Sequence, residues 1–308
     1  MHLRGRPVDR MSAAPGYQNG RRSAAALRRR RILLRTLAVL PVLVVAGLLL
    51  VHFAATDPRT TSDDAQGRQP PAAAAPASLD DRIAAIIADA GDCRVAVAVA
   101  DVSGDVVETY GDDSRFFAAS TAKIITAAAY YHLVEGGQLR LDEQLGDFDA
   151  AFQLQAMIND SNNDAWLLLM QRIGYPELID YAASIGITYD PEENLLTATD
   201  LAVVLRGLDN GVLLDAEDTA QLLGFMQDTN NEDLIPAASR ADITVHHKYG
   251  EVEGNLHDAA LLSDGTATFA LVVLTEDPRD PATDDVDQIQ LIRSVTQAVE
   301  DTLLPTGR

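Results

Sequence analysis

The order of its hydrophobic patterns restricts this 308-residue chain to few architectures. An amphipathic helix pattern after Leu79 is followed by alternating strand patterns at 94–101 and 106–110, which Ser103-Gly104 can join as a hairpin turn. Helical patterns then occupy 119–134, 164–173, 176–185, 198–209 and 215–227; strand patterns return at 243–247, 259–262 and 268–274, before a last helix at 284–303. This segregation predicts an α+β fold: strands from both ends of the chain form an antiparallel sheet flanked by helices, with an all-helical lobe inserted between them.

The N-terminal region predicts a membrane anchor. Four arginines at 28–31 precede an apolar run at 36–55, and twenty residues at helical rise span about 30 Å, the thickness of a bilayer's hydrocarbon core. Arginine-rich flanks stay in the cytoplasm, so the rest of the chain is expected outside. The predicted parts are a basic cytoplasmic tail (1–31), a transmembrane anchor (32–55), a Pro/Ala-rich linker (56–78) and a folded domain (79–308). A cleaved signal peptide is the alternative, although residues 53–55 make a poor cleavage site.

Charge and cysteine content restrict the classes of molecule that the domain can bind and exclude an internal disulfide. The formal net charge is -22, yet residues 1–55 carry ten Arg and one Asp, so the rest of the chain holds 14 basic and 45 acidic side chains. Such an acidic domain repels nucleic acid and anionic lipid. The single cysteine, Cys93, can form no internal disulfide and is interpreted as a small buried residue beside a strand. We expect a monomer that meets the membrane through its anchor.

Two lysines are the most informative residues. Of 24 Lys and Arg side chains only Lys123 and Lys248 are lysine, so this chain uses arginine wherever a positive charge suffices. An arginine cannot shuttle protons at neutral pH, whereas the pKa of a buried lysine amine can fall towards neutrality. Ser120 and Lys123 stand at i and i+3 at the start of a predicted helix, where the amine can activate the hydroxyl as a nucleophile. The alternative is that Ser120 caps a buried helix.

Two further motifs share this character. Ser161-Asn162-Asn163 begins the helix that carries Trp166, and it offers one hydroxyl to relay a proton and one amide to orient an acyl group. Ordinary helix capping is the competing interpretation. Lys248-Tyr249-Gly250 follows a predicted strand, so that Lys248 is expected at a strand end, where it would face an anionic substrate. A surface strand end without a role is the alternative there.

In chain order, these three motifs resemble the S-x-x-K, S-D-N and K-T-G motifs of class A β-lactamases and penicillin-binding proteins, a family of penicillin-recognising serine hydrolases. The resemblance covers about residues 79–305. It implies an acyl-enzyme on Ser120, no cofactor and no metal, and a β-lactam or cell-wall peptide as substrate. The implied catalytic residues are Ser120, Lys123 and Ser161; the implied substrate-binding residues are Asn163, Lys248, Tyr249, Gly250 and Glu251, with the Ser120 and Glu251 amides as oxyanion hole.

Three departures from the family pattern bear on activity. Asn162 replaces an Asp, and Tyr249 places a bulky ring where a small hydroxyl is usual. In class A β-lactamases a longer loop carries an E-x-x-L-N segment whose glutamate activates the deacylating water, whereas residues 187–196 are short and lack it. Glu192 and Glu193 lie in this stretch at a spacing that does not match. We therefore expect acylation with slow deacylation.

Two other functions remain open. One is a penicillin-binding D-alanyl-D-alanine carboxypeptidase-like enzyme, which the outward topology suits; the other is a non-catalytic cell-wall-binding module that kept the fold. A metal site at His246 and His247 is disfavoured, because neighbouring residues on a strand point to opposite faces.

Overall fold

The structure is a computed structural model that describes residues 77–279 and 286–306. The predicted tail and anchor, and the linker up to residue 76, lie outside the described residues. Within those two ranges, no helix has both the length and the apolar character needed to cross a bilayer.

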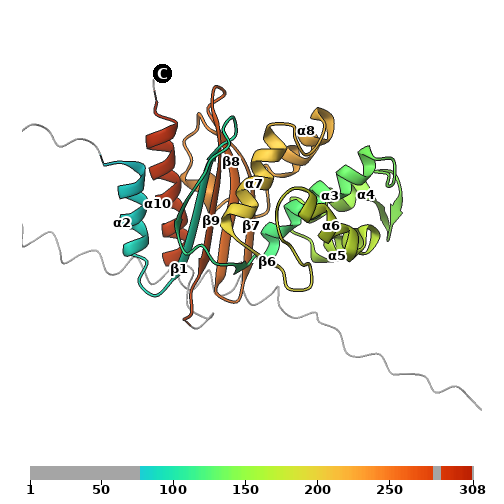
Figure 1. Ribbon diagram of the computed structural model, residues 1–308, viewed down its shortest axis with the longest axis horizontal. Helices are drawn as coiled ribbons and strands as arrows, with labels where there is room; N and C mark the ends of the chain where they lie inside the picture. The colour runs from blue at the N-terminus through green and yellow to red at the C-terminus, as the bar shows by residue number, and fades with distance from the viewer. Residues whose placement is uncertain (1–76, 280–285, 307–308) are drawn as a thin grey trace, which may run out of the picture. The chain divides into compact units, whose positions relative to one another are not determined.

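A five-stranded antiparallel sheet unites the two ends of the domain (Figure 1). Its strands lie in the order β2-β1-β9-β8-β7, so the N-terminal hairpin pairs with the C-terminal meander. The predicted sheet of strands from both ends of the chain is thus confirmed. The strands are β1 (Arg94–Asp101), β2 (Val107–Gly111), β7 (Thr244–Val252), β8 (Asn255–Ser263) and β9 (Thr268–Glu276).

Strand β1 is buried on both faces. Valines and alanines alternate along it, so the valines face one packing layer and the alanines the other. Val95, Val97 and Val99 belong to the apolar cluster that includes α2 (Leu79–Ala88) and α10 (Val286–Leu303). The alanines between them belong to a second cluster, in which α7 (Ala198–Asp209) packs on the sheet. Small side chains let this helix approach the strand closely, and Figure 1 shows α2 and α10 on one side of the sheet and α7 on the other.

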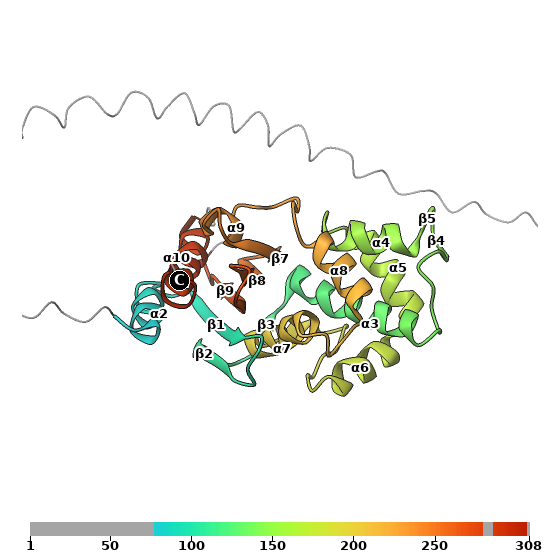
Figure 2. The same ribbon diagram turned by 90° about the horizontal axis from the view of Figure 1, so that it is seen from above.

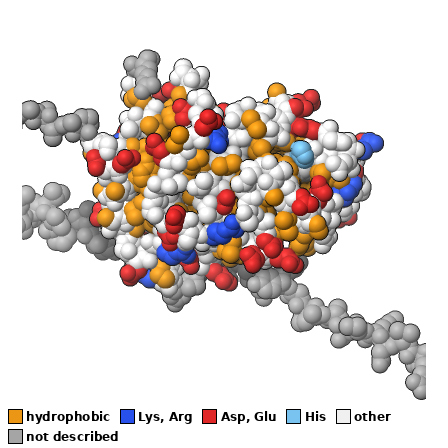
Figure 3. All heavy atoms as spheres, viewed as in Figure 1, with side chains coloured by type: hydrophobic (Ala, Val, Ile, Leu, Met, Phe, Trp, Pro, Cys, Tyr) orange, Lys and Arg blue, Asp and Glu red, His pale blue; other side chains and the backbone are white. Residues whose placement is uncertain are grey.

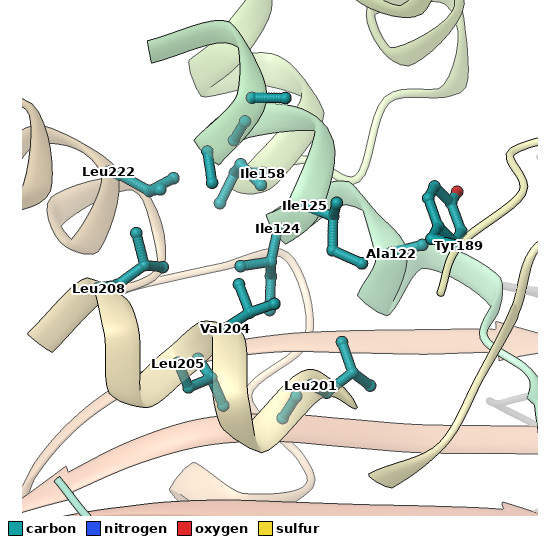
Figure 4. Close-up of a cluster of buried hydrophobic side chains, with 14 of the residues drawn as sticks. Ala122, Ile124, Ile125, Ile158, Tyr189, Leu201, Val204, Leu205, Leu208 and Leu222 are labelled. Atoms are coloured by element: carbon teal, nitrogen blue, oxygen red, sulfur yellow. The ribbon is translucent and has the colours of Figure 1, made fainter. Parts of the chain in front are cut away.

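The inserted lobe is built around α3 (Lys123–Glu135), whose residues from 123 to 131 are all buried. Figure 4 shows Ile124 and Ile125 of this helix facing Leu201 and Val204 of α7. The other lobe helices are α4 (Ala150–Ile158), α5 (Asn163–Ile173), α6 (Tyr175–Ser184) and α8 (Ala216–Phe225), which surround α3 in Figure 2. The short elements are β3 (Phe116–Phe117), η1 (Ala119–Ala122), β4 (Gln144–Leu145), β5 (Phe148–Asp149), β6 (Leu195–Leu196) and α9 (Ile235–Ala238).

Two local expectations were wrong. The helix expected from residue 119 begins with a 3-10 turn, η1, before α3 starts at Lys123. The strand expected to end at residue 247 continues to Val252, because Lys248 pairs with Ala259 and the hairpin turns only at Glu253-Gly254, both of which have positive φ. Lys248 therefore lies in the middle of a strand rather than at its end.

Acidic side chains are spread over the surface in Figure 3, with few basic ones between them. This agrees with the negative balance of the sequence after residue 55. A surface of this sign disfavours binding to phosphate backbones.

Strand β7 packs directly against η1 at Gly250. A Cβ atom added there would lie 2.9 Å from the Ser120 amide nitrogen, 3.0 Å from the Ala118 carbonyl oxygen and 3.1 Å from the Ala119 Cβ. Two of these neighbours are backbone atoms, which cannot rotate away. Only a glycine lets the strand and the turn that carries Ser120 approach this closely.

We expect Gly250→Ala to destabilise the domain by about 1–3 kcal/mol, because the added methyl group forces β7 and η1 apart. Gly224→Ala is the matched control: its site in α8 has open space within 4 Å, and alanine is the better helix former, so it should stabilise the domain by about 0.5–1 kcal/mol. Urea unfolding followed by circular dichroism measures both free energies. Equal effects of the two substitutions would contradict this packing.

Candidate active site

Ser120 and Lys123 are brought together by the 3-10 geometry of η1. With three residues per turn, position i+3 lies directly over position i, and the Lys123 Nζ is 2.9 Å from the Ser120 Oγ. Ala119, just before the serine, has a φ of 48°, a left-handed conformation that is unfavourable for alanine. The turn that presents Ser120 is therefore held in place by its surroundings.

The amine of Lys123 has oxygen partners from the second motif as well. It donates to the Ser161 carbonyl oxygen and to the Asn163 Oδ1, each at 2.8 Å, and the Ser161 Oγ lies 3.2 Å away. Two carbonyl acceptors require two N–H groups, which a neutral amine retains. The lone pair of that neutral amine can then accept the Ser120 proton, so proton transfer requires no rearrangement of Lys123.

Burial tunes this amine. Lys123 is fully buried in its helix, and burial lowers its pKa to about 8. The Nζ also lies 5.0 Å from the centre of the Trp166 ring, whose Nε1 donates to the Thr126 hydroxyl at 2.8 Å. Trp166 is partly buried and forms one wall around the amine.

Lys248 is the second buried amine of the site. Its pKa is lowered to about 7, mainly by burial and also by the nearby charge of Lys123, while the charge of Asp258 acts in the opposite direction. Its Nζ donates to the Tyr249 carbonyl oxygen at 3.1 Å and lies 4.2 Å from the centre of the Tyr249 ring. The charge of Lys123 reaches Lys248, so the two amines lie near each other although residues 123 and 248 are far apart in the chain.

Tyr249 joins the third motif to the second. Burial raises the pKa of its phenol, while hydrogen bonding with the side chains of Asn230 and Ser161 lowers it. The aromatic residue that departs from the family pattern thus reaches the same serine that contacts Lys123. Ser161 has a φ of 55°, which is a left-handed backbone conformation. Its side chain and that of Asn163 both face the Lys123 amine.

The backbone amides predicted as oxyanion hole lie close in the fold. The His247 N–H leaves the sheet to donate to the Met226 carbonyl oxygen at 2.8 Å. Because N–H directions alternate along a strand, the Glu251 N–H points off the same edge of β7. Gly250, the residue before Glu251, lies against the Ser120 nitrogen, so the Ser120 and Glu251 amides are close to each other.

The loop before α7 supports the nucleophile through an amide. Asn194 is buried with a φ of 54°; its Nδ2 donates to the Ala119 carbonyl oxygen at 3.1 Å, and its own carbonyl accepts from the Ala118 N–H at 2.8 Å. Glu192 and Glu193, considered as deacylating bases, are exposed. Sequence reasoning missed Asn194, whose only signal is an asparagine, a residue that tolerates left-handed backbone, just before an apolar pair.

The three histidines of the sheet have separate structural contacts. His246 and His247 point to opposite faces as expected: the Nδ1 of His246 lies 2.8 Å from the Leu223 carbonyl oxygen, whereas that of His247 lies 2.9 Å from the Asp258 carboxylate. His257 is fully buried; its Nδ1 accepts from the Thr275 N–H at 3.1 Å, so its Nε2 donates to the Phe117 carbonyl oxygen at 2.9 Å. Burial lowers the His257 pKa to about 4. This imidazole ties β8 and β9 to the segment before Ser120.

Solved structures share this fold. A beta lactamase from Xanthomonas campestris pv. campestris str. ATCC 33913 superposes with a TM-score of 0.65 at 24% identity, covering 73% of this chain and 99% of that one. PBP-A gives a TM-score of 0.66 at 21% identity, covering 73% and 96%. The beta-lactamase from Sphaerobacter thermophilus DSM 20745 gives 0.62 at 24% identity, covering 72% and 97%. A search among curated proteins found no match.

A family model assigns the chain more directly. The model Beta-lactamase2, described as beta-lactamase enzyme family, matches residues 78–303, which include all three motifs and both lobes of the domain. The antiparallel sheet, the inserted helices and the site around Ser120 agree with that match. The chain therefore belongs to the beta-lactamase enzyme family and is a serine hydrolase of that family.

Proposed function

We propose that this protein is an extracytoplasmic hydrolase that opens a β-lactam or a related amide through an acyl-enzyme on Ser120 and releases the acyl group slowly. The observation that carries the proposal is the 2.9 Å contact between the Ser120 Oγ and the amine of a fully buried lysine with a pKa of about 8. About a tenth of such an amine is unprotonated at pH 7 and can accept a proton, and a serine needs such a base to become nucleophilic.

Acylation follows from the contacts of this amine. The neutral Lys123 takes the Ser120 proton while the Oγ forms a bond to the carbonyl carbon, and the carbonyl electrons move onto oxygen next to the Ser120 and Glu251 amides. The C–N bond then breaks, and the leaving nitrogen takes the proton of the Ser161 hydroxyl. The Ser161 Oγ lies 3.2 Å from the protonated Lys123, which can return that proton, so that the amine ends neutral and the acyl-enzyme is formed.

Substrate binding is assigned to Lys248, Asn163 and Tyr249. In the described part of the chain the Lys248 Nζ has one hydrogen-bond acceptor, so a protonated Lys248 retains donors for a substrate carboxylate. The Asn163 Oδ1 faces Lys123, which directs its NH₂ group away from the amine and towards a bound acyl group. The Tyr249 ring narrows the space beside Lys248 and favours a slender substrate.

Slow release is supported by the partners of Lys123. All its hydrogen-bond acceptors in the described chain are hydroxyl, carbonyl or amide oxygens, and the loop that precedes α7 contributes the buried amide of Asn194, not a carboxylate. A water molecule attacking the ester would lack a strong base. One structure of a PBP-A point mutant is an acyl-enzyme complex with penicillin-G, and the present chain shares its fold at 21% identity.

The extracytoplasmic location is proposed from the sequence alone. The apolar run at 36–55 follows an arginine-rich segment, an arrangement that keeps the N-terminus in the cytoplasm. A linker of about 23 residues would then separate the catalytic domain from the bilayer.

Incubation with benzylpenicillin should add the mass of the whole penicillin to the protein, because ring opening loses no atoms. The adduct should lie on the peptide that contains Ser120, be absent in Ser120→Ala, and persist for minutes or longer after free penicillin is removed. Glu192→Gln and Glu193→Gln should release it at the wild-type rate. Intact mass spectrometry over time measures all four proteins. An unmodified wild type that also hydrolyses no penicillin would refute the proposal.

The acylation rate constant should report the protonation of Lys123. It should rise about tenfold per pH unit at low pH and level off near pH 8, since only the neutral amine accepts the Ser120 proton. Affinity for an anionic β-lactam should weaken above about pH 7, where Lys248 loses its charge. Lys123→Arg keeps the positive charge but cannot be deprotonated, and should slow acylation at least about 1000-fold at every pH. Rapid-quench kinetics measures both constants; a flat pH profile would exclude Lys123 as the base.

Membrane topology can be tested with two cysteines in a Cys93→Ser background. A membrane-impermeant maleimide added to cells should label Ser62→Cys, in the linker, but not Ser23→Cys, in the basic tail, because the two positions lie on opposite sides of the anchor. Both should react after detergent is added. Labelling of both positions, or of neither, in intact cells would contradict the proposed orientation.

A further inference from the structure

Beside Lys248 lies an ionic cluster, centred on the buried His247, that the mechanism does not use. His247 is 1% exposed and has a carboxylate on each side: its Nδ1 is 2.9 Å from Asp258 Oδ1, and its Nε2 is 3.1 Å from Glu232 Oε1 and 3.0 Å from the Thr229 hydroxyl. Both ring nitrogens therefore face acceptors that require a donor. Burial lowers the pKa of His247, but the charge of Asp258 and the hydrogen bonds to Asp258 and Glu232 outweigh burial and raise it.

The cluster fixes the segment 229–235, which connects the helical lobe to the sheet. Glu232 Oε1 also accepts from the Thr229 N–H at 2.6 Å and from its hydroxyl at 2.8 Å. Asp258 Oδ2 accepts from the Ile235 N–H at 3.1 Å. Contacts to Thr229, Glu232 and Ile235 thus converge on one imidazole and its two carboxylates.

From this segment, Asn230 reaches the turn that presents Ser161. Its N–H donates to the Asn159 carbonyl oxygen at 3.2 Å, and its Nδ2 donates to the Asp160 carbonyl oxygen at 2.7 Å. Its side chain also lies near the Tyr249 phenol, whose pKa it lowers. Asn230 therefore contacts the residues immediately before Ser161 and lies near the residue immediately after Lys248.

We infer that His247 is a positioning residue: clamped between Asp258 and Glu232, it holds the 229–235 segment, and through Asn230 it fixes the Ser161 turn opposite Lys248. Ser161, at a φ of 55°, is in a conformation that needs such support. The charged groups around the imidazole are Asp258 on β8, Glu232 on the segment and Lys248 on its own strand, coupled through Asp258. The inference depends on the proposed function for its kinetic test only.

The test compares His247→Gln, Asn230→Ala, the double variant and His246→Gln. His246 is the matched control, because it neighbours His247 on β7 but bonds to Leu223 on the opposite face. His247→Gln and Asn230→Ala should each lower the acylation rate constant by benzylpenicillin about tenfold, with the dissociation constant of the initial complex changed less than about threefold, since Lys248 remains. The double variant should match the slower single variant within about twofold, because both act through one route. His246→Gln should match the wild type.

Multiplicative effects in the double variant, or an equal loss in His246→Gln, would overturn the inference. If the wild type does not react with benzylpenicillin, the proposed function fails, and amide hydrogen exchange of residues 158–163 in the free protein decides this inference separately. Exchange should be faster in His247→Gln and Asn230→Ala but not in His246→Gln; unchanged exchange would refute it. Should His247→Gln not fold, Glu232→Gln replaces it in both measurements. Glu232 is exposed, so the substitution leaves the core intact, and it removes one of the two carboxylates that hold His247.

Discussion

The burial of two amines within one site governs the rest of the structure. An ammonium group loses hydration when buried, and burial lowers the pKa of Lys123 to about 8. Burial and the nearby charge of Lys123 together lower the pKa of Lys248 to about 7. Oxygen atoms of Ser161 and Asn163 in the helical lobe partly offset this cost for Lys123, whose amine also lies over the Trp166 ring. The Lys248 amine lies over the Tyr249 ring. Strand β7 of the sheet positions Lys248, and helix α3 positions Lys123.

Backbone strain concentrates where the lobe meets the sheet. In the described chain, five residues other than glycine have positive φ: Ala119, Ser161, Asn194, Asp228 and, in the β7–β8 turn, Glu253. Such conformations cost on the order of 1–3 kcal/mol each and persist only when neighbours enforce them. The first three adjoin or carry groups of the site, and the fourth directly precedes the segment clamped by His247. These strained conformations lower the stability locally, and they orient the Ser120 hydroxyl, the Ser161 carbonyl and the Asn194 amide.

Sequence patterns predicted the fold class, the bounds of β1 and all three motifs, because alternation and chemical type are local properties. They failed where a contact between distant residues decides the outcome. Lys248 lies inside a strand because Ala259 pairs with it, and Ser120 lies in a 3-10 turn because Gly250 and Asn194 hold it there. Helix α4 was missed although Ala150, Leu154 and Ile158 recur there at helical spacing. The contribution of Asn230 could not be predicted, because an amide that bonds to a backbone oxygen 70 residues away leaves no periodic signal.

The fully buried His257 gives the domain an acid limit through proton linkage. Its ring is neutral when folded, with one nitrogen accepting from Thr275 and the other donating to Phe117, and its pKa of about 4 lies below the 6.5 of a free imidazole. Between pH 6.5 and pH 4 this histidine is protonated in the unfolded chain but stays neutral in the native state. The difference lowers the free energy of unfolding as the pH falls, by about 2 kcal/mol at pH 5. The same imidazole that ties the sheet to the segment before the nucleophile therefore makes that tie sensitive to acid.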